Sequence, residues 1–294
     1  MDWERIKNIF ILVFMLLNAV FLAQLWLVPT YFDSSMYISS QQVETKLAEL
    51  QYNNISVDTR VPRRLKRLQM LTVQVPSRDQ EAFAAAILGS EAEAVSTPLA
   101  SGSTKFASPQ GEVEFTAKGQ IFCSLSRQPG RSELSRRSAK IQAEEFLRRT
   151  LGKPRDAKIG RIVQLNEIWA VEYYQRWREK NLDIARITIW LDGTGVLGME
   201  YYWVEVLGFV GEEIVTIPAT GALSVAAEKM TAGTVITRIY TSWYSPPVHA
   251  EQWRCYPVWV VETADGTKYY INAFTGEFEG QSGLPAGKPG SVLN

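Results

Sequence analysis

The sequence predicts an α+β protein in which a single N-terminal transmembrane helix precedes an extracytoplasmic domain of antiparallel sheets with helices. Three observations support this fold class. An uncharged apolar run lies near the start, the composition is rich in aromatic residues that suit strands, and a pattern of helix and strands recurs in the second half. The length of 294 residues allows one large or two small domains, at about 100 to 200 residues per domain.

The apolar run extends from Ile9 to Val28 and contains no charged residue. A helix of about 20 residues spans the roughly 30 Å core of a bilayer. Each Leu, Ile, Phe or Val favours insertion by about 0.3 to 0.6 kcal/mol, which outweighs the cost of the uncharged polar residues Asn18 and Gln24. We therefore predict a transmembrane helix over residues 9–28.

The orientation of this helix follows from the charges beside it. Arg5 and Lys7 precede the run, whereas no Lys or Arg follows it until Lys46. The positive-inside rule therefore places residues 1–8 in the cytoplasm and the rest of the chain outside. A cleavable signal peptide is the alternative, but its apolar region is about 7 to 15 residues long and ends at small residues. Pro29 follows here instead, which favours a retained membrane anchor.

One face of this helix carries a polar side chain near the middle of the membrane. Asn18 shares that face, at spacings of three and four residues, with Phe10, Phe14, Phe21 and Leu25. Because an amide in lipid favours a hydrogen-bonding partner, we predict that these five residues bind another transmembrane helix. The alternative is that Asn18 bonds the backbone of its own helix.

Residues 36–89 are expected to form an N-terminal extracytoplasmic α/β subdomain. Apolar spacing after a Ser-rich start predicts a helix over 39–50, and β-branched runs predict strands over 55–61 and 68–75. An Ala-rich helix is predicted over 79–88.

A basic cluster lies between these two predicted strands. A solvated turn explains it most simply, and contact with anionic lipid or wall polymer is the alternative. The cluster consists of Arg60, Arg63, Arg64, Lys66 and Arg67.

Two segments rich in Gly, Pro, Ser and Ala are predicted to be loops. Residues 90–111 are expected to form a linker, and residues 281–294 a flexible tail. Between them we place two helix-strand repeats, the first over 112–215 and the second over 216–280.

The repeat is visible as a skeleton of recurring residues. IWAVE at 168–172 is echoed by VWVVE at 258–262. Their tryptophans, Trp169 and Trp259, are predicted to pack in the core and across strands. Each copy follows a predicted helix and precedes a strand, a Thr-Gly turn and a further strand, where glycine can take the positive φ of a hairpin. The helices are expected over 134–151 and 218–230, and the strand-turn-strand segments over 187–199 and 269–279.

The sequence contains no recognisable catalytic apparatus. GTGVLG at 193–198 fits the dinucleotide fingerprint, but strand-forming residues follow where that site needs a helix, so we predict a hairpin turn. His249 is the only histidine, and it lies in a proline-bearing loop. Glu172 and Glu262 recur at equivalent positions of the repeats, which favours a structural role over acid-base catalysis.

Metal, redox and nucleic-acid functions are also disfavoured. Asp192 and Asp265 precede glycines in turns and lack the further acidic ligands of a calcium loop. Cys123 and Cys255 match no metal or redox spacing; they are either two buried free thiols or, in an oxidising exterior, one disulfide. The 31 acidic and 31 basic residues balance, so nucleic acid is not an expected partner. We predict no catalytic, metal-binding or cofactor-binding residue, and therefore no enzyme.

Three segments of the chain resemble the YycI family, the membrane-anchored accessory proteins of the YycFG (also called Wal) two-component system. They are the opening MDWERIKNIFILVFMLLNAVFLAQ at 1–24, the segment 52–75 with NNI, Pro62 and LQMLTV, and the ending YPVWVVETADGTKYYINAFTGEFEG at 256–280. The W-x-V-E pattern followed by a T-G turn also resembles PepSY-type modules, so the two repeats are expected to be PepSY-like.

The resemblance implies an exterior domain that associates with a YycH-like protein. It also implies that the transmembrane helix contacts a YycG/WalK-type sensor histidine kinase and modulates its activity in the control of cell-wall metabolism; by position, residues 9–28 with Asn18 would be the contact. A tethered PepSY-type ligand-binding or protease-inhibiting envelope module is a second hypothesis. A third, an envelope hydrolase, needs a nucleophile or paired carboxylates in a cleft.

Overall fold

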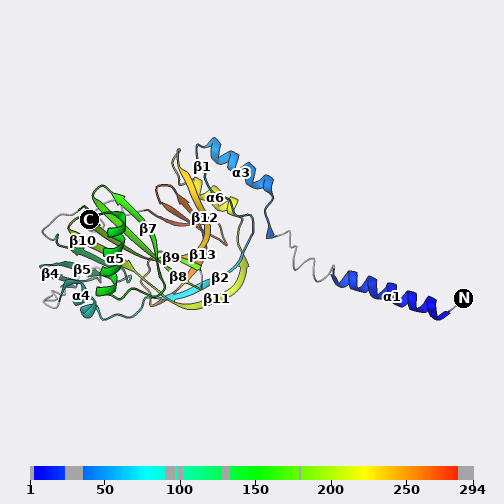
Figure 1. Ribbon diagram of the computed structural model, residues 1–294, viewed down its shortest axis with the longest axis horizontal. Helices are drawn as coiled ribbons and strands as arrows, with labels where there is room; N and C mark the ends of the chain where they lie inside the picture. The colour runs from blue at the N-terminus through cyan, green and yellow to red at the C-terminus, as the bar shows by residue number, and fades with distance from the viewer. Residues whose placement is uncertain are drawn as a thin grey trace.

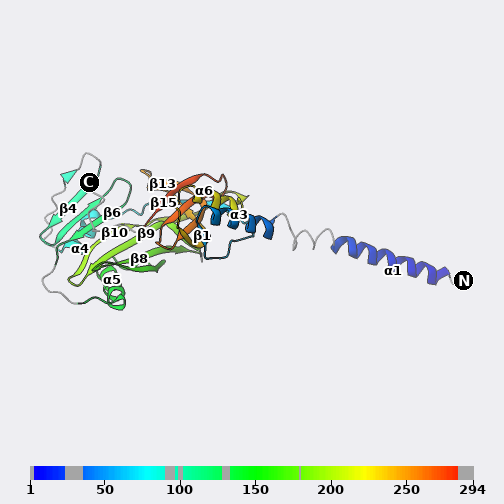
Figure 2. The same ribbon diagram turned by 90° about the horizontal axis from the view of Figure 1, so that it is seen from above.

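A computed structural model describes residues 3–23, 36–89, 97–98, 102–127, 133–178 and 180–283. The fold is α+β, as the sequence predicts, and its strands pair mostly in antiparallel fashion (Figures 1 and 2). Within these residues, 15 strands belong to one sheet.

The helices that follow residue 36 lie where the sequence predicts them. Three of them begin after a residue whose side-chain oxygen accepts a hydrogen bond from a backbone N–H of the first turn, namely Ser39, Asp79 and Ser135. The fourth begins after Pro218 and has no side-chain cap. Their bounds are α3 (Ser40–Tyr52), α4 (Gln80–Leu88), α5 (Arg136–Thr150) and α6 (Ala219–Ala227).

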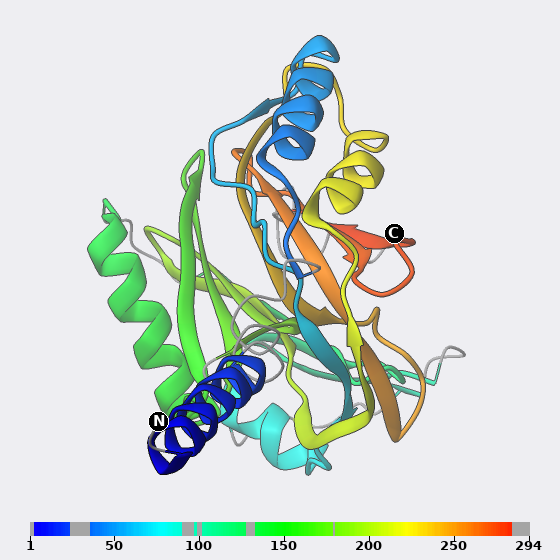
Figure 3. The ribbon, with the colours of Figure 1, turned by 90° about the vertical axis from the view of Figure 1, so that its right-hand side faces the viewer.

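The first helix-strand unit consists of α5 and four antiparallel strands that pair in chain order. The glycines of GTGVLG lie in the turn between the third and fourth strands and in the fourth strand, so the predicted hairpin is confirmed. Ala139, Ala143 and Leu147 bury one side of α5 against the sheet, and Figure 3 shows this helix (green) on the outer side of the strands. The strands are β7 (Ala157–Leu165), β8 (Ile168–Trp177), β9 (Lys180–Asp192) and β10 (Gly195–Tyr202).

The second unit repeats this order with α6 and four more antiparallel strands. The predicted Thr-Gly turn joins its last two strands, with Gly276 at φ +82°. Ala222, Leu223 and Ala226 bury α6, which lies on the opposite outer side of the molecule from α5 (yellow in Figure 3). The strands are β12 (Val235–Tyr244), β13 (Gln252–Thr263), β14 (Lys268–Asn272) and β15 (Phe278–Ser282).

The repeated tryptophans hold the two helices in the same way. Trp169 of β8 donates its indole N–H to the Leu134 carbonyl at 2.9 Å, and Trp259 of β13 donates to the Ile217 carbonyl at 3.0 Å. Each carbonyl belongs to the residue before the N-terminal cap of the unit's helix. Both side chains are buried, as predicted, so each tryptophan fills the core and fixes where its helix begins.

The N-terminal segment does not fold apart from these units. β2 (Arg67–Gln74) lies between β11 (Glu205–Val215) and the first residues of β13, antiparallel to both. Strand β1 (Ser56–Val57) pairs parallel with β12, and α3 packs against α6. The strand predicted over 55–61 is thus only two residues long, and Pro62, which has no N–H to donate, follows soon after it. The basic cluster around it is exposed, as a solvated turn requires.

The predicted linker over 90–111 differs from the structure in its last third. Residues 104–108 form β4 (Thr104–Ser108), which pairs with β5 (Gly111–Phe115) and through it with β6 (Ile121–Leu125). The Ser, Gly and Ala content suggested a loop, but Phe106 is only 3% exposed and anchors the strand in the core. A short strand, β3 (Thr97–Pro98), pairs with β4. In the predicted tail, residues 281 and 282 end β15, and residues 284–294 lie outside the described residues.

The N-terminal apolar run lies on helix α1 (Trp3–Leu22), which stands apart from the strands in Figure 1. Among the helices of the described segments, none meets the length and hydropathy required to cross a membrane. Residues 24–28 of the predicted span lie outside the described residues.

Candidate functional site

The inner faces of the two units are polar, although each unit buries apolar residues against its own helix. Strand register places Glu172, Thr188 and Glu200 side by side on β8, β9 and β10. The next row on the same face contains Tyr174, Arg186 and Tyr202.

The second unit presents a matching face. Arg238, Glu262 and Lys268 form one row across β12, β13 and β14, and Tyr240, Val260 and Tyr270 form the next row. Residues of both faces line a cavity of about 410 Å³, which we call the inter-unit cleft. Alternation along each strand explains this arrangement, because every second side chain points away from the helix-covered core.

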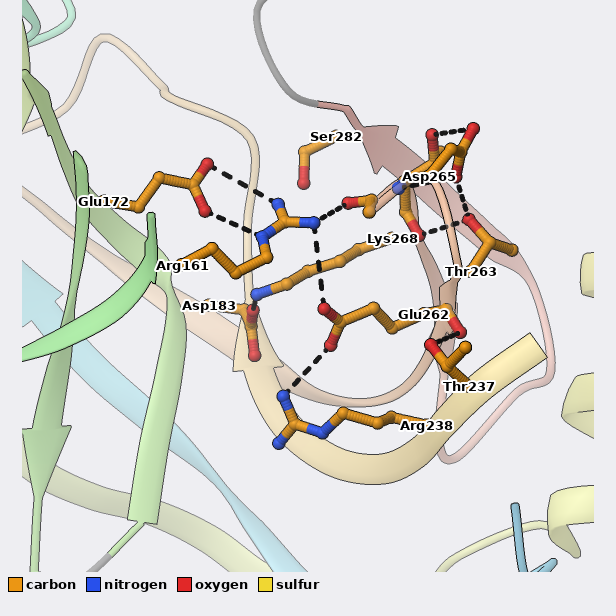
Figure 4. Close-up of polar contacts among 12 residues, drawn as sticks. Arg161, Glu172, Asp183, Thr237, Arg238, Glu262, Thr263, Asp265, Lys268 and Ser282 are labelled. Atoms are coloured by element: carbon orange, nitrogen blue, oxygen red, sulfur yellow. Dashed lines mark hydrogen bonds and ion pairs between the residues drawn. The ribbon is translucent and has the colours of Figure 1, made fainter. Parts of the chain in front are cut away.

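Arg161 of β7 links the two faces (Figure 4). Its Nε donates to Glu172 Oε2 at 2.9 Å, and its Nη1 donates to the Gly266 carbonyl of the other unit at 2.6 Å. The same Nη1 lies 3.8 Å from Glu262 Oε1, and Arg238 Nη1 donates to Glu262 Oε2 at 3.1 Å. Arg161 therefore pairs with both of the glutamates that recur in the two repeats, and Arg238 is the closer partner of Glu262.

A second ion pair crosses the cleft near the first. Lys268 Nζ of β14 donates to Asp183 Oδ1 of β9 at 2.5 Å. The hydroxyl of Tyr240 donates to the same carboxylate, at 3.2 Å to Oδ2. The Asp183 side chain is only 5% exposed, so this carboxylate depends on both partners for the hydrogen bonds that water would otherwise supply.

The remaining charged pair of the cleft shares no hydrogen bond. Arg186 Nη2 lies 3.6 Å from Glu200 Oε2, beyond hydrogen-bond distance, and the two side chains are 31% and 18% exposed. Beside this pair, the rings of Tyr244 and Tyr270 stack with their centroids 3.8 Å apart. Within the described part of the chain, the buried hydroxyl of Tyr202 has no hydrogen-bond partner.

The cleft shifts the titration of its own groups. Burial disfavours the charged form of Arg161, but Glu172 and Glu262 outweigh burial and raise the pKa of Arg161 above its usual value. Burial, with Asp183 nearby, raises the pKa of both Tyr240 and Tyr270 far above that of a free tyrosine. The cleft therefore holds a charged arginine beside neutral tyrosines over the whole physiological range.

The ion-pair network of the cleft is better explained by the conformational specificity that it gives the fold than by a gain in stability. Buried ion pairs contribute little net stability, because desolvation offsets most of their attraction. Residues of equal size but apolar character would close the two faces into an ordinary core. Four basic side chains instead face four acidic ones, and they keep the cleft open and polar: Arg161, Arg186, Arg238 and Lys268, with Glu172, Asp183, Glu200 and Glu262.

The residues weighed as catalytic in the sequence are placed as follows. Glu172 and Glu262 do come together, but both are engaged by Arg161, in agreement with the structural role predicted for them. His249 is exposed and does not line the cleft, although Pro247 of the same loop does. Asp192 and Asp265 each accept the backbone N–H of a threonine two residues later, so they are turn residues.

The two cysteines lie on different strands of the interior. Cys123 is on β6 and Cys255 on β13, and both are buried free thiols, which was the simpler of the two alternatives. Burial raises the pKa of each thiol to about 12, so neither is reactive near neutral pH. In the described segments, no three His, Cys, Asp or Glu side chains gather as a metal site.

The predicted partner-binding face of α1 is exposed. Phe10 is 73%, Phe14 67% and Phe21 51% exposed. Asn18 Nδ2 donates to the Phe14 carbonyl at 2.8 Å, the intrahelical bond that was the alternative to an interhelical one. Leu25 lies outside the described residues.

Sequence reasoning missed most of the cleft. It singled out Glu172 and Glu262, but not the cations that face them or the tyrosines beside them. The available signal was the presence of charged residues in the middle of otherwise apolar strands, such as Arg186 in DIARITIW and Arg238 in VITRIY. Such positions need a partner when the strand is buried.

The fold and the cleft define a class of protein: two helix-strand units of antiparallel sheet that enclose a polar cavity. A sequence model of the family described as YycI protein matches residues 33–274. The chain therefore belongs to the YycI family, as the resemblance indicated. This membership implies an accessory role in the YycFG/WalK two-component system.

Comparison with other proteins adds two similar solved structures. One is an uncharacterized protein from Eubacterium rectale, with a TM-score of 0.46, 10% identity, and coverage of 80% of this chain and 98% of that one. The other is the C-terminal domain of YpeB from Bacillus megaterium, with a TM-score of 0.38, 10% identity, and coverage of 85% and 99%. No curated protein matches the sequence.

Proposed function

We propose that this protein is a membrane-anchored, non-enzymatic regulator that modulates a YycG/WalK-type sensor histidine kinase. In this proposal the segment 9–28 spans the cell membrane once, with residues 1–8 in the cytoplasm. The exterior domain associates with a YycH-like protein, and the spanning helix contacts helices of the kinase within the lipid. The system that it regulates controls cell-wall metabolism.

The observation on which this proposal rests is the exposed apolar surface of α1. Its large apolar side chains from Ile9 to Leu22 are between 46% and 73% exposed, and they pack against no core of the exterior domain. Lipid or another helix would cover such a surface, whereas water disfavours it by about 25 cal/mol for each Å².

Asn18 supports a helix partner rather than lipid alone. Its amide nitrogen bonds the Phe14 carbonyl, which leaves the amide oxygen to accept a bond from another helix. Interhelical bonds of this kind contribute only about 0.6 to 2 kcal/mol, but they select register and neighbour. A regulator of this type acts only if its helix binds one signalling state of the kinase more tightly than the other.

This proposal includes no enzyme activity because the acidic residues that catalysis would need are engaged in ion pairs. The two carboxylates that a hydrolase would need are Glu172 and Glu262; Arg161 pairs with both, and Arg238 also pairs with Glu262. The single histidine is exposed in a loop.

The test is to replace residues 9–28 by an unrelated membrane helix and to measure kinase autophosphorylation and target-gene output in cells. We expect the regulation to be lost while the exterior domain still recovers a YycH-like partner. Asn18→Leu should weaken kinase recovery in mild detergent, whereas Met15→Leu, a control at another exposed position of α1, should not. Unaltered kinase output after the helix exchange would contradict the helix-contact mechanism.

The inter-unit cleft favours the second hypothesis, a tethered PepSY-type ligand-binding or protease-inhibiting envelope module. That hypothesis predicts that a soluble fragment beginning at about Met36 retains full activity without the anchor. Loss of regulation by that fragment in cells would separate it from the leading proposal.

A further inference from the structure

We propose that the inter-unit cleft binds a small saccharide, of about disaccharide size and with no net charge. The inference deepens the proposed function by naming the chemistry of an exterior signal. Its test measures binding directly, so it can fail while the helix-contact mechanism stands, and the reverse also holds.

The cleft has the dimensions of a ligand site. Its volume of about 410 Å³ falls within the range of about 300 to 1,000 Å³ typical of small-molecule pockets. It lies at the junction of two folded units, where such pockets often occur. Both walls are strands anchored by a buried tryptophan and a packed helix, so the site is held by rigid elements.

Charge balance excludes a strongly charged ligand. The four cations and four anions of the cleft form pairs, and three of those cations have a carboxylate within 3.1 Å. An anionic ligand would have to draw a cation away from its carboxylate, and a cationic ligand would have to draw a carboxylate away from its cation. A ligand without net charge leaves every pair in place.

The groups that remain for a ligand are hydrogen-bond donors and acceptors that lie close together. Arg186 and Glu200 are too far apart to share a hydrogen bond, so the guanidinium keeps free N–H donors and the carboxylate keeps free acceptor positions. The Tyr202 hydroxyl lies in the same cross-strand row as Arg186, but it is buried beside the core and is not among the groups that a ligand would meet. Neighbouring sugar hydroxyls, each both donor and acceptor, match this set.

An aromatic surface completes the site. Tyr244 lines the cleft beside the Arg186 and Glu200 pair and is partly exposed, whereas Tyr270, on which it stacks, is only 2% exposed. A sugar ring presents weakly polar C–H groups on its faces and hydroxyls at its rim. One aromatic ring, that of Tyr244, and a charged pair would therefore contact the two parts of the same ligand, which a purely apolar or purely ionic molecule would not satisfy.

The experiment uses the full chain in lipid nanodiscs, because maltoside and glucoside detergents carry the chemistry under test. A glycan array of uncharged oligosaccharides of two to four rings identifies a ligand, and isothermal titration then measures its Kd. We expect saturable binding to the wild type and at least a tenfold weaker Kd for Glu200→Gln. Glu112→Gln, which alters an exposed ion pair on β5, is the matched control and should leave the Kd unchanged.

Two controls keep the result interpretable. Thermal unfolding of each variant establishes that it is folded, and Arg186→Lys, which keeps the charge but loses the planar fork, should weaken binding on its own. The proposal is overturned if no uncharged saccharide on the array binds, if Glu200→Gln and Glu112→Gln bind equally, or if zwitterionic dipeptides bind the cleft in place of saccharides.

Discussion

The two helix-strand units share their order and their tryptophan contact, but they stabilise their helices differently. α5 spans 15 residues and has a side-chain cap at Ser135, whereas α6 spans 9 residues and has no side-chain cap at Pro218. α3 covers α6, and its Leu50 is buried in the same core cluster, while α4 packs against α5. The uncapped α6 therefore depends on packing against α3, whereas α5 has a side-chain cap of its own.

This difference has a functional consequence. α3 begins at residue 40, a short distance from the apolar run, and it packs on the unit that forms one wall of the cleft. A change in the cleft can reach α3 through α6, and a change at α3 can reach the cleft in the reverse direction. Because such coupling must be reciprocal, either effect is evidence for the other.

The largest expected effect comes from removing the tryptophan of the weaker unit. Trp259→Ala should lower the free energy of unfolding by about 3 to 5 kcal/mol, because it empties a fully buried site and frees the start of an uncapped helix. Trp169→Ala should cost less, since α5 keeps its cap. Urea unfolding followed by circular dichroism checks both, and an equal or larger loss for Trp169→Ala would contradict the comparison.

The dependence of the second unit on α3 gives the next effect. Leu50 is 2% exposed between α3 and α6, so Leu50→Ala should cost about 2 to 4 kcal/mol. Hydrogen exchange should show the loss of protection concentrated in α6 rather than in α5. Ile141→Ala, at a 54% exposed position of α5, is the control and should stay within about 0.5 kcal/mol of the wild type. Uniform loss of protection in both helices would show that the units do not differ in this respect.

These contacts separate the features that can be predicted from the sequence from those that cannot. The caps at Ser39, Asp79 and Ser135 are local, and so are the Thr-Gly hairpins, because neighbouring residues alone decide them. The insertion of β2 between β11 and β13 joins segments more than a hundred residues apart, and no local pattern records it. The Ser, Gly and Ala content likewise led to a loop prediction where the chain forms β4, a strand that the buried Phe106 anchors in the core.

The cleft shows the same limit at the level of single residues. The repeat identified Glu172 and Glu262 as equivalent, but their shared partner could not be read from the sequence. Arg161 reaches the Gly266 carbonyl, 105 residues away, only because strand register brings the two faces together. Register depends on the whole sheet, since a shift of one residue would turn each side chain to the other face.

A matched pair of glycine variants isolates the link between the units. Gly266 and Gly233 both have positive φ, +86° and +89°, so alanine is strained at either position. A Cβ at Gly233 meets open space, whereas one at Gly266 would overlap the Arg161 guanidinium. Gly266→Ala should therefore cost about 1 to 3 kcal/mol more than Gly233→Ala, the effect of displacing a partly buried hydrogen-bonded charge. Equal unfolding midpoints in urea would mean that Arg161 does not hold the units together.

The smallest effect at neutral pH is expected from Tyr240, and it grows with pH. The folded state raises the pKa of Tyr240, so this side chain stays protonated at pH values where tyrosines of the unfolded chain, with a pKa near 10.0, have ionised. Its contribution to stability is complete below pH 10 and is lost as the pH rises further, by about 1.4 kcal/mol for each pH unit. Tyr240→Phe removes the titrating group, so stability should fall less steeply between pH 9.5 and 11 in the variant than in the wild type. Urea unfolding across that range measures both slopes. Parallel slopes would show that the hydroxyl is not held neutral by the cleft, and the polar face of the second unit would then have to be more open to water than that of the first.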